Sequence, residues 1–432
     1  MSAAATSGSA AGAATSVPAA IALNQPVLRW SARAHSIAEV EQELSRIWAN
    51  QDLTTEMDGE PGRRHIAART SVMNLVVIAR RPEIAERSAG TIQALTGRHP
   101  SRTIVVQSAD PDGPSWIDAQ VEAHCVLPRE DAPEICAETI HLTVGGEAGR
   151  HLTAIVTPLI VHDLPVTVWW PGEPPFMFRA ARDLLAAADC LVVDGSTWNG
   201  DGLERLREMA GLLDTTALAI SDFAMVRQSR WREAIASIYD DPDFTPYLRS
   251  LRRIAVTYAT HDETGAPGST NLVRPIYHVA WLASRLGMSV VRPLAVASGG
   301  ASASRARPVP GARPVVSRGL IAALSDGRGE VSVVVRPVVS TVPAGTTLRV
   351  ELLAERRGSE FRADVTAEAE TVHVRVWQDG IEVLDRQFLA SRRADVDLLA
   401  EAIESGRQDV VALGTLRSAA NLAGGAISGP SA

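Results

Sequence analysis

Residues 151–178 read HLTAIVTPLIVHDLPVTVWWPGEPPFMF, and their pattern predicts the centre of the fold. Apolar residues recur at helical spacing over residues 152–159, which predicts a short helix. Pro165 then disfavours a helical conformation of the residue before it. Residues 165–170 are β-branched and aromatic, which is typical of a buried strand. The proline-rich residues 171–175 end this strand, so a helix, a turn, a strand and a rigid loop follow one another.

The two tryptophans of this strand, Trp169 and Trp170, cannot both enter one layer, because adjacent side chains on a strand face opposite ways. Either both faces of the sheet are covered and both rings fill the core, or one ring is exposed at the carboxyl end of the strand. Open α/β sheets place their working surface at that end. We expect Trp169 to be buried, and Trp170, which is nearer the proline-glycine exit, to be an exposed interface anchor.

The rest of the pattern predicts an α/β fold in two parts. In the N-terminal part, expected strands such as 72–79 and 116–126 alternate with amphipathic helices such as 82–95. This alternation predicts a layered, mostly parallel sheet. Later, short runs over residues 331–388 are separated by turn residues, and Asp379-Gly380 suits a tight hairpin. The second part is therefore expected to be α+β with an antiparallel meander.

The length of 432 residues exceeds what one ordinary core uses and suggests two domains. The first 28 residues carry no charged side chain and are rich in Ala, Ser, Gly and Thr, which indicates disorder. The predicted division is a disordered tail at 1–30, an N-terminal α/β domain at 31–220, a C-terminal α+β domain at 221–424 with a flexible insert at about 297–314, and a tail at 425–432.

The composition excludes several classes of protein. A net charge of −8 argues against sequence-independent binding of nucleic acid, which needs a basic face. All 42 basic residues are arginine, so Schiff-base and P-loop lysines are excluded. No apolar run is long enough to span a membrane and no signal peptide is recognisable, so a cytoplasmic protein is expected. The three cysteines have neither metal-ligand spacing nor the even number of a disulfide framework.

The candidate motifs for catalysis are incomplete. The loop Gly145–Gly149 lies between an expected strand and a helix and could hold an anion, but its spacing differs from G-x-G-x-x-G. His162 and Asp163 are adjacent, which does not orient one side chain onto the other. Asp194-Gly195-Ser196 follows an expected strand without the glycine that a nucleophile elbow needs, so a turn is favoured. The sequence predicts no catalytic residue, no cofactor site and no metal site.

One signature remains, and it carries a family resemblance. Asp163-Leu164-Pro165, a short strand, Trp169-Trp170, Gly172 and Glu173-Pro174-Pro175 resemble the signature of the glucose-6-phosphate dehydrogenase assembly protein (OpcA) family. The flanking stretches 69–79, 99–106, 189–196 and 229–234 agree with the family in order and spacing. The resemblance covers roughly residues 36–420. The chain departs from the family in its Ala-rich tail, in the insert, and in Pro171 before the glycine.

The resemblance implies a non-enzymatic protein that binds glucose-6-phosphate dehydrogenase, favours its active assembly and supports the oxidative pentose phosphate pathway. It implies no cofactor. The partner-binding or signature residues carried over from the family are Asp163, Leu164, Pro165, Trp169, Trp170, Gly172 and Glu173, with Trp231 and Arg232 second. Redox control through cysteines, suspected for some family members, finds no support in the cysteine spacing. The alternative is a sugar-phosphate-binding protein or enzyme that uses the Gly145–Gly149 loop.

Overall fold

A computed structural model describes residues 25–49, 55–56, 64–65, 68–110, 112–129, 134–297, 309–368, 370–405 and 409–424. The predicted tail at 425–432, most of the predicted tail at 1–30 and most of the predicted insert lie outside these residues. The chain forms two compact units. Unit 1 comprises residues 1–171 and 178–189, and unit 2 comprises residues 172–177 and 190–432. Apart from residues 172–177, the second unit begins at residue 190, whereas the sequence prediction placed the domain boundary at residue 220.

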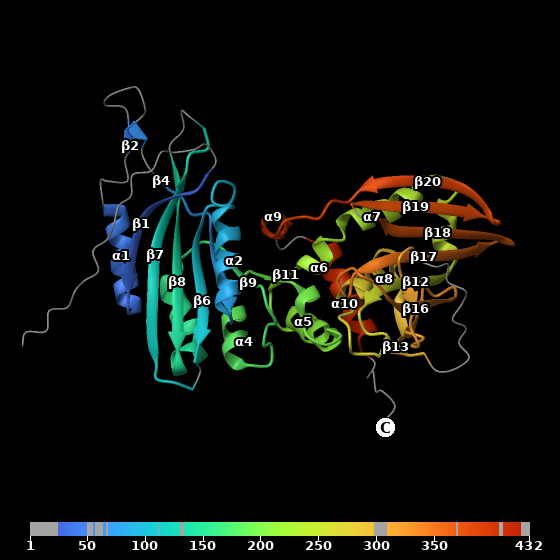
Figure 1. Cartoon of the computed structure of the whole chain (residues 1–432), viewed down its shortest axis with the longest axis horizontal. Coiled ribbons are helices and arrows are strands. Elements are labelled where there is room, and N and C mark those ends of the chain that lie inside the picture. The colour runs from blue at the N-terminus through green and yellow to red at the C-terminus, as the bar shows by residue number, and fades with distance from the viewer. Residues whose placement is uncertain are drawn as a thin grey trace, which may run out of the picture. The chain divides into compact units, whose positions relative to one another are not determined.

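Unit 1 is built on one mixed sheet with the strand order β1-β7-β8-β6-β5-β9 (Figure 1). The strands β8, β6, β5 and β9 run parallel, and β7 and β1 add an antiparallel edge. Their bounds are β1 Val27–Ala34, β5 Met73–Ala79, β6 Ser101–Ala109, β7 Trp116–Val126, β8 Ile135–Gly145 and β9 Val166–Trp170. Short strands β2 Thr55–Glu56, β3 Arg64–His65 and β4 Ala68–Arg69 complete the unit, with β4 paired to β8.

Helices cover both faces of this sheet. Their bounds are α1 Ile37–Ala49, α2 Pro82–Gln93, α3 Leu152–Val156 and α4 Arg179–Ala186, with 3₁₀ helices η2 Gly146–Arg150 and η3 Thr157–Leu159. The crossovers β5–α2–β6 and β8–α3–β9 run in opposite directions across the strand order. Because such connections are right-handed, their helices lie on opposite faces. All seven residues of β5 are accordingly buried.

The structure corrects two sequence predictions in this unit. β1 begins at Val27, so residues 27–30 belong to the sheet and not to the predicted tail. The helix expected over residues 152–159 is divided into α3 and η3, because Pro158 lacks the N–H that would continue an α-helical ladder. Ser36 and Glu39 cap α1 reciprocally, with the Glu39 amide donating to Ser36 and the His35 amide donating to Glu39.

Unit 2 opens with a parallel pair, β10 Cys190–Val193 and β11 Ala219–Asp222, joined through α5 Leu203–Thr215. In the described residues, its main sheet has nine strands in the order β13-β15-β16-β12-β17-β18-β19-β20, with β14 paired to β16. The bounds are β12 Leu251–Thr260, β13 Ser289–Val296, β14 Arg313–Pro314, β15 Leu320–Ser325, β16 Glu330–Val339, β17 Thr347–Arg356, β18 Ser359–Glu368, β19 Thr371–Gln378 and β20 Ile381–Leu389. Residues 313–314 of the predicted flexible insert therefore belong to the sheet.

The predicted meander is present: β17, β18, β19 and β20 pair antiparallel in chain order. Asp379 and Gly380 both have positive φ in the hairpin turn between β19 and β20. Phe361 on β18 is buried against the rings of Tyr239, Phe244 and Tyr247 at 4.7–6.0 Å. The meander ends at β20, which is the last strand in this order and has mostly exposed side chains.

The helices of unit 2 are α6 Phe223–Val226, α7 Ser229–Ile238, α8 Val273–Arg285, α9 Asp395–Ser405 and α10 Val410–Leu422, with 3₁₀ helices η4 Gly195–Thr197 and η5 Thr245–Ser250. α8 packs on β12, β16 and β17, and α10 packs on α8. The predicted α/β class with an α+β second part is confirmed. None of the helices in the described ranges is both long and apolar enough to cross a lipid bilayer.

Candidate functional site

The tryptophan strand is buried on both faces. Trp169 is 3% exposed and Trp170 is 2% exposed, so the expectation of an exposed Trp170 is wrong. The physical reason is the helix cover on both faces of the sheet, which leaves neither tryptophan in solvent. Trp170 therefore fills the core, as the first of the two predicted arrangements requires.

The signature turn before β9 has a structural role. Asp163 is exposed and has a φ of 67°, the left-handed conformation that asparagine and aspartate tolerate in turns. The buried side chain of Asn74 on β5 holds this turn: its amide donates to the carbonyls of Val161 at 2.9 Å and Leu164 at 3.3 Å. Its oxygen accepts from the Val161 amide at 2.7 Å. Asp163, Leu164 and Pro165 thus set the entry of the chain into β9.

The second half of the signature, Gly172 and Glu173, belongs to unit 2. The Glu173 carboxylate accepts hydrogen bonds from Arg205 at 2.8 Å and from Asn199 at 2.6 Å. Burial alone would raise the pKa of Glu173, but the bonds from Arg205 and Asn199 outweigh it and lower the pKa. A Cβ at Gly172 would meet no atom within 4 Å, so space does not require glycine there.

Trp231 and Arg232 also lie in unit 2, on α7, and are half-buried. The Trp231 ring packs against His278 of α8 with 5.1 Å between centroids. Arg232 donates to the carbonyl of Met225 at 3.0 Å. Burial lowers the pKa of Arg232 in spite of the nearby carboxylates of Asp409, Glu401 and Glu233. These contacts hold α7 against its neighbours, so both residues stabilise unit 2.

A buried polar cluster lies at the carboxyl ends of β10 and β11, where sequence reasoning expected only a turn. Asp194 accepts from the Ser196 hydroxyl at 2.5 Å and from Arg227 at 2.7 Å. Asp222 accepts from the amides of Gly195 at 2.9 Å and Ala224 at 2.8 Å. Because Ser196 donates to a carboxylate that is already paired with Arg227, the cluster lacks the base that a serine nucleophile needs.

Burial raises the pKa values of two acidic groups in this cluster, Asp222 and Tyr277. The pKa of Asp222 is raised to about 6, first by burial and then by the neighbouring charge of Asp194. Tyr277 donates its hydroxyl to Asp222 at 2.7 Å, and its own pKa is raised by burial and by that carboxylate. The acidic residues at the two strand ends are visible in the sequence, but only the parallel pairing of β10 and β11 brings them together.

The glycine loop does not form an open anion cradle. Residues 146–150 form the five-residue 3₁₀ helix η2. A Cβ at Gly145 would lie 2.1 Å from the indole nitrogen of Trp116, so this glycine makes room for the tryptophan. Gly146 has a φ of 58° and approaches the backbone of residues 113–114 too closely for a side chain. Packing therefore accounts for both glycines without a phosphate.

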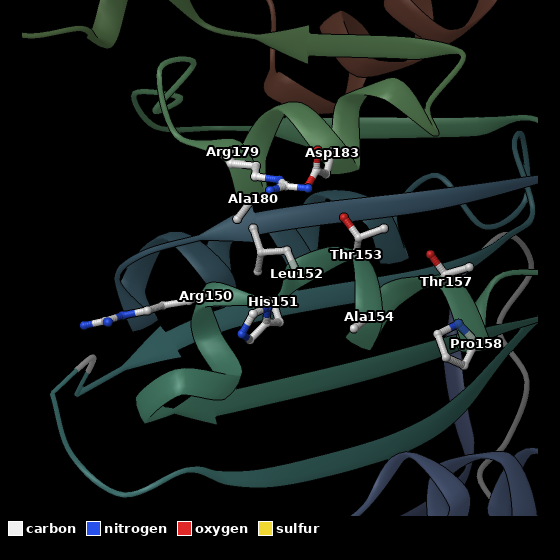
Figure 2. Close-up of a pocket in the computed structure, with 10 residues that line it drawn as sticks. All are labelled: Arg150, His151, Leu152, Thr153, Ala154, Thr157, Pro158, Arg179, Ala180 and Asp183. Carbon is white, nitrogen blue, oxygen red and sulfur yellow. The ribbon is translucent and has the colours of Figure 1, made fainter.

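A pocket of about 700 Å³ lies beside this loop in unit 1 (Figure 2). It is bounded by the end of η2, by α3, by the start of η3 and by α4. Its lining residues are Arg150, His151, Leu152, Thr153, Ala154, Thr157, Pro158, Arg179, Ala180 and Asp183. Arg150 pairs with Asp112 and Glu147, and Arg179 pairs with Asp183, at 3.3–3.4 Å. Arg150, Arg179 and Asp183 are exposed, whereas Leu152 is buried.

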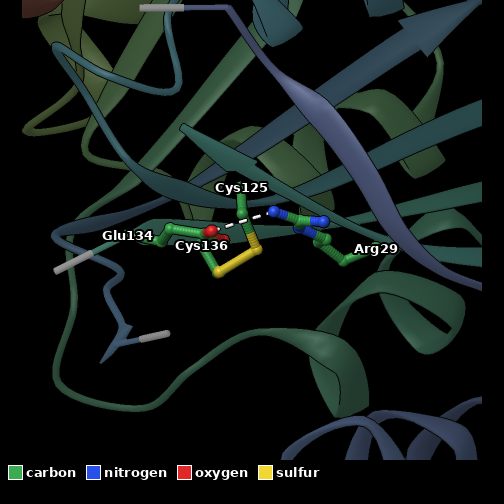
Figure 3. The surroundings of a disulfide bond; sticks show 4 residues. All are labelled: Arg29, Cys125, Glu134 and Cys136. Atoms are coloured by element: carbon green, nitrogen blue, oxygen red, sulfur yellow. Dashed lines mark hydrogen bonds and ion pairs between the residues drawn. A yellow bond between two sulfur atoms is a disulfide. The ribbon is translucent and has the colours of Figure 1, made fainter. Parts of the chain in front are cut away.

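A disulfide joins Cys125 of β7 to Cys136 of β8, which the cysteine spacing did not predict (Figure 3). The two residues are direct partners in the antiparallel register, with 4.0 Å between their Cα atoms. The sulfurs lie beside Glu134, which is buried and ion-paired with Arg29 at 2.9 Å. With both sulfurs oxidised, this group of Cys125, Glu134 and Cys136 offers no thiolates to a metal ion.

Cys190 is the remaining cysteine and is free and buried. Burial raises the pKa of its thiol to about 12, so the thiolate that would react is scarce at neutral pH. The buried Cys190 thiol therefore has little reactivity.

We expect removal of the disulfide to lower the free energy of unfolding by about 2–3 kcal/mol, because a short covalent loop restricts the unfolded chain. Urea unfolding of the Cys125→Ala/Cys136→Ala variant measures this loss. Thiol titration of the denatured wild-type chain should give one free thiol before reduction and three after it. Three free thiols without reductant would contradict the disulfide.

Comparisons with known proteins identify relatives of part of the chain. Residues 92–210 match a family model described as the glucose-6-phosphate dehydrogenase subunit N-terminal domain. The chain is 27% identical over 199 residues to the OxPP cycle protein OpcA of Synechocystis sp. and 28% identical over 173 residues to that of Nostoc punctiforme. These matches cover 46% and 39% of this chain, and only 39% and 34% of the two relatives.

Solved structures show a weaker likeness. An oxidoreductase from Sinorhizobium meliloti aligns with 82% of this chain and 96% of its own, at 10% identity and a TM-score of 0.44. A TM-score of this size supports no conclusion about function.

Proposed function

Because residues 92–210 match the glucose-6-phosphate dehydrogenase assembly protein (OpcA) family, we propose that this chain binds glucose-6-phosphate dehydrogenase and favours its active assembly. The resemblance predicted from the Trp169-Trp170 segment is confirmed by the family model and by the curated relatives. The family match is the observation that carries the proposal. The protein would act in the cytoplasm, in the oxidative pentose phosphate pathway.

The proposed role is non-catalytic. Three groups that could serve in catalysis are engaged in the fold: Ser196 donates to Asp194, Cys190 is a buried thiol, and His278 is buried. Burial lowers the pKa of His278 to about 3, so its ring is neutral near pH 7. These environments support a binding protein over an enzyme.

A binding protein can activate an enzyme only through a difference in affinity. It must bind the active assembly more tightly than the inactive form. A difference of about 1–3 kcal/mol corresponds to roughly a 5- to 150-fold shift in the equilibrium. The signature residues Asp163, Leu164, Pro165, Gly172 and Glu173 would contribute indirectly, by fixing the loops at both ends of β9.

We expect the purified chain alone to show no oxidation of glucose 6-phosphate with NAD or NADP. Added to the dehydrogenase of its own organism, it should raise the activity and the proportion of the larger assembly. Enzyme assays and light scattering at several molar ratios measure both effects, with the heat-unfolded chain as control. Turnover by the chain alone, or no binding to the dehydrogenase, would contradict the proposal.

A further inference from the structure

A buried carboxylate lies beside the disulfide of unit 1 (Figure 3). Cys125 and Cys136 are register partners on β7 and β8, so their side chains lie on one face of the sheet. Glu134 is two residues before Cys136, the spacing that places both side chains on one face of an extended chain. One donor atom of each residue lies within 4.8 Å of the other two, and all three residues are buried. We call Cys125, Glu134 and Cys136 the cysteine–glutamate group.

One oxygen of the Glu134 carboxylate has no hydrogen-bond partner among the described residues. Arg29 donates to Oε1 of Glu134 at 2.9 Å. Oε2 of the same carboxylate is buried and accepts no hydrogen bond. A carboxylate oxygen that is removed from water costs free energy unless a donor or a cation replaces the water. The oxidised group therefore contains an unsatisfied atom of a type that binds cations.

The charges around the group suit a divalent cation. In the oxidised chain, Glu134 and Arg29 form a buried ion pair without net charge. Reduction followed by loss of both thiol protons would add two buried negative charges, which is costly without compensation. A divalent cation between the two thiolates restores a net charge of zero. Arg29 would remain hydrogen-bonded to the carboxylate and orient it, as residues behind metal ligands commonly do.

The donor atoms select the kind of ion. Mg²⁺ and Ca²⁺ take oxygen ligands, whereas Zn²⁺ binds both thiolate sulfur and carboxylate oxygen. Around a tetrahedral zinc ion, two thiolate sulfurs lie roughly 3.8 Å apart, so the sulfurs must separate after reduction but the strands need not. Among the described residues, no fourth His, Cys, Asp or Glu joins the group. A water molecule would therefore complete the tetrahedron.

We propose that the cysteine–glutamate group binds a zinc ion when its disulfide is reduced. A dithiol reductant breaks the sulfur–sulfur bond, gives two electrons and two protons to Cys125 and Cys136, and itself becomes a disulfide. Zn²⁺ then replaces the two thiol protons, which pass to solvent, and binds the Glu134 carboxylate. The disulfide and the zinc complex are alternative states of one site. Cytoplasmic thiols are kept reduced, so the location proposed above would favour the zinc-binding state.

Titration with Co²⁺ tests this site, because Co²⁺ can take the place of Zn²⁺ and its bonds to thiolates absorb in the near ultraviolet. The full chain without a histidine tag is reduced, freed of reductant and titrated without air. The reduced wild type should develop this absorbance up to about one ion per chain, and added Zn²⁺ should abolish it. The oxidised wild type is the sharpest control, since it has the same residues but no thiolates at Cys125 and Cys136. It should develop no such absorbance.

Three variants identify the ligands. Cys125→Ala/Cys136→Ala should lose the cobalt–thiolate absorbance. Glu134→Gln keeps the shape of the side chain without its charge and should weaken Co²⁺ binding by at least about 10-fold, since even residues behind metal ligands contribute this much. Cys190→Ala removes the remaining cysteine and should titrate like the wild type. A melting curve of each variant without metal shows that it is folded.

The outcomes are distinct. The proposal fails if the reduced wild type develops no cobalt–thiolate absorbance, or if the absorbance persists in Cys125→Ala/Cys136→Ala. Equal Co²⁺ affinity of Glu134→Gln and the wild type would overturn the assignment of Glu134 as a ligand. The comparison of the reduced and oxidised wild type decides the matter even where a variant does not fold. None of these measurements involves the dehydrogenase, so their result is independent of the proposed function.

Discussion

We expect Trp170→Ala to lower the free energy of unfolding by about 3–5 kcal/mol, the cost of emptying a large buried aromatic site. Trp169→Ala should cost a similar amount, because both rings are buried on opposite faces of β9. A loss of this size approaches the whole stability of an ordinary domain. Urea unfolding followed by circular dichroism measures this loss. Both variants should lose the proposed activation of the dehydrogenase only as they lose structure.

The control for the tryptophans is Trp116→Ala. Trp116 is 40% exposed at the start of β7 and packs on Gly145, so its removal empties less buried volume and should cost clearly less. A folded Trp170→Ala variant of normal stability that fails to activate the dehydrogenase would contradict the burial of Trp170. It would restore the interface anchor that was expected from the position of this residue at the strand end.

The second large effect concerns two buried groups of unit 2 that respond to pH in opposite ways. Asp222 has a pKa of about 6 in the folded chain against an ordinary value of 3.8. Between these values the folded state holds the extra proton, so acidification stabilises it. His278 has a pKa of about 3 against an ordinary 6.5, because of burial and then the charge of Arg232. Between these values the unfolded state holds the extra proton, so acidification destabilises the fold.

In the wild type the two contributions largely cancel between about pH 6 and pH 4. Asp222→Asn keeps an oxygen for the amides of Gly195 and Ala224 but no longer titrates, so its stability should fall on acidification. His278→Phe keeps a ring against Trp231 and should gain stability on acidification. For each variant, the slope of the unfolding free energy against pH should differ from that of the wild type by about 1.4 kcal/mol per pH unit. The two variants should therefore diverge by about 4 kcal/mol between pH 6 and pH 4.5.

Urea unfolding from pH 4.5 to pH 7.5 measures these slopes. Differences relative to the wild type are the relevant quantity, because titrating groups that lie away from Asp222 and His278 contribute equally to all three proteins. Thr415→Ser, a change at a buried residue without a titrating group, is the control. Its free energy of unfolding should depend on pH in the same way as that of the wild type. Parallel curves for Asp222→Asn and His278→Phe would show that neither group has a shifted pKa.

Much of the local structure could be predicted because its signals are local. The apolar run of β5 indicated a strand, and β7 has the bounds that its sequence predicted. The Asp379-Gly380 turn was predicted from its backbone preferences alone. The signature turn at Asp163 was found as well, but its partner Asn74 was not, since 87 residues separate Asn74 from Val161.

The contacts that define the sites depend on pairings that no local pattern contains. Cys125 and Cys136 become partners only through the register of β7 and β8. An odd number of cysteines gave no reason to expect a bond between them. The misplacement of Trp170 has the same origin: its position near a proline-glycine exit suggested exposure, but the crossovers on both faces decide its burial.

The bond between β7 and β8 also determines how the chain responds to mechanical force. Cys125 and Cys136 are 11 residues apart in sequence and opposite each other in the hairpin, so a pull on either end cannot slide one strand along the other. A machine that threads proteins through a narrow ring, such as an ATP-dependent unfoldase, would reach a closed loop that it must pass as a doubled chain. The oxidised chain should therefore stall at β7, and the reduced chain should pass through.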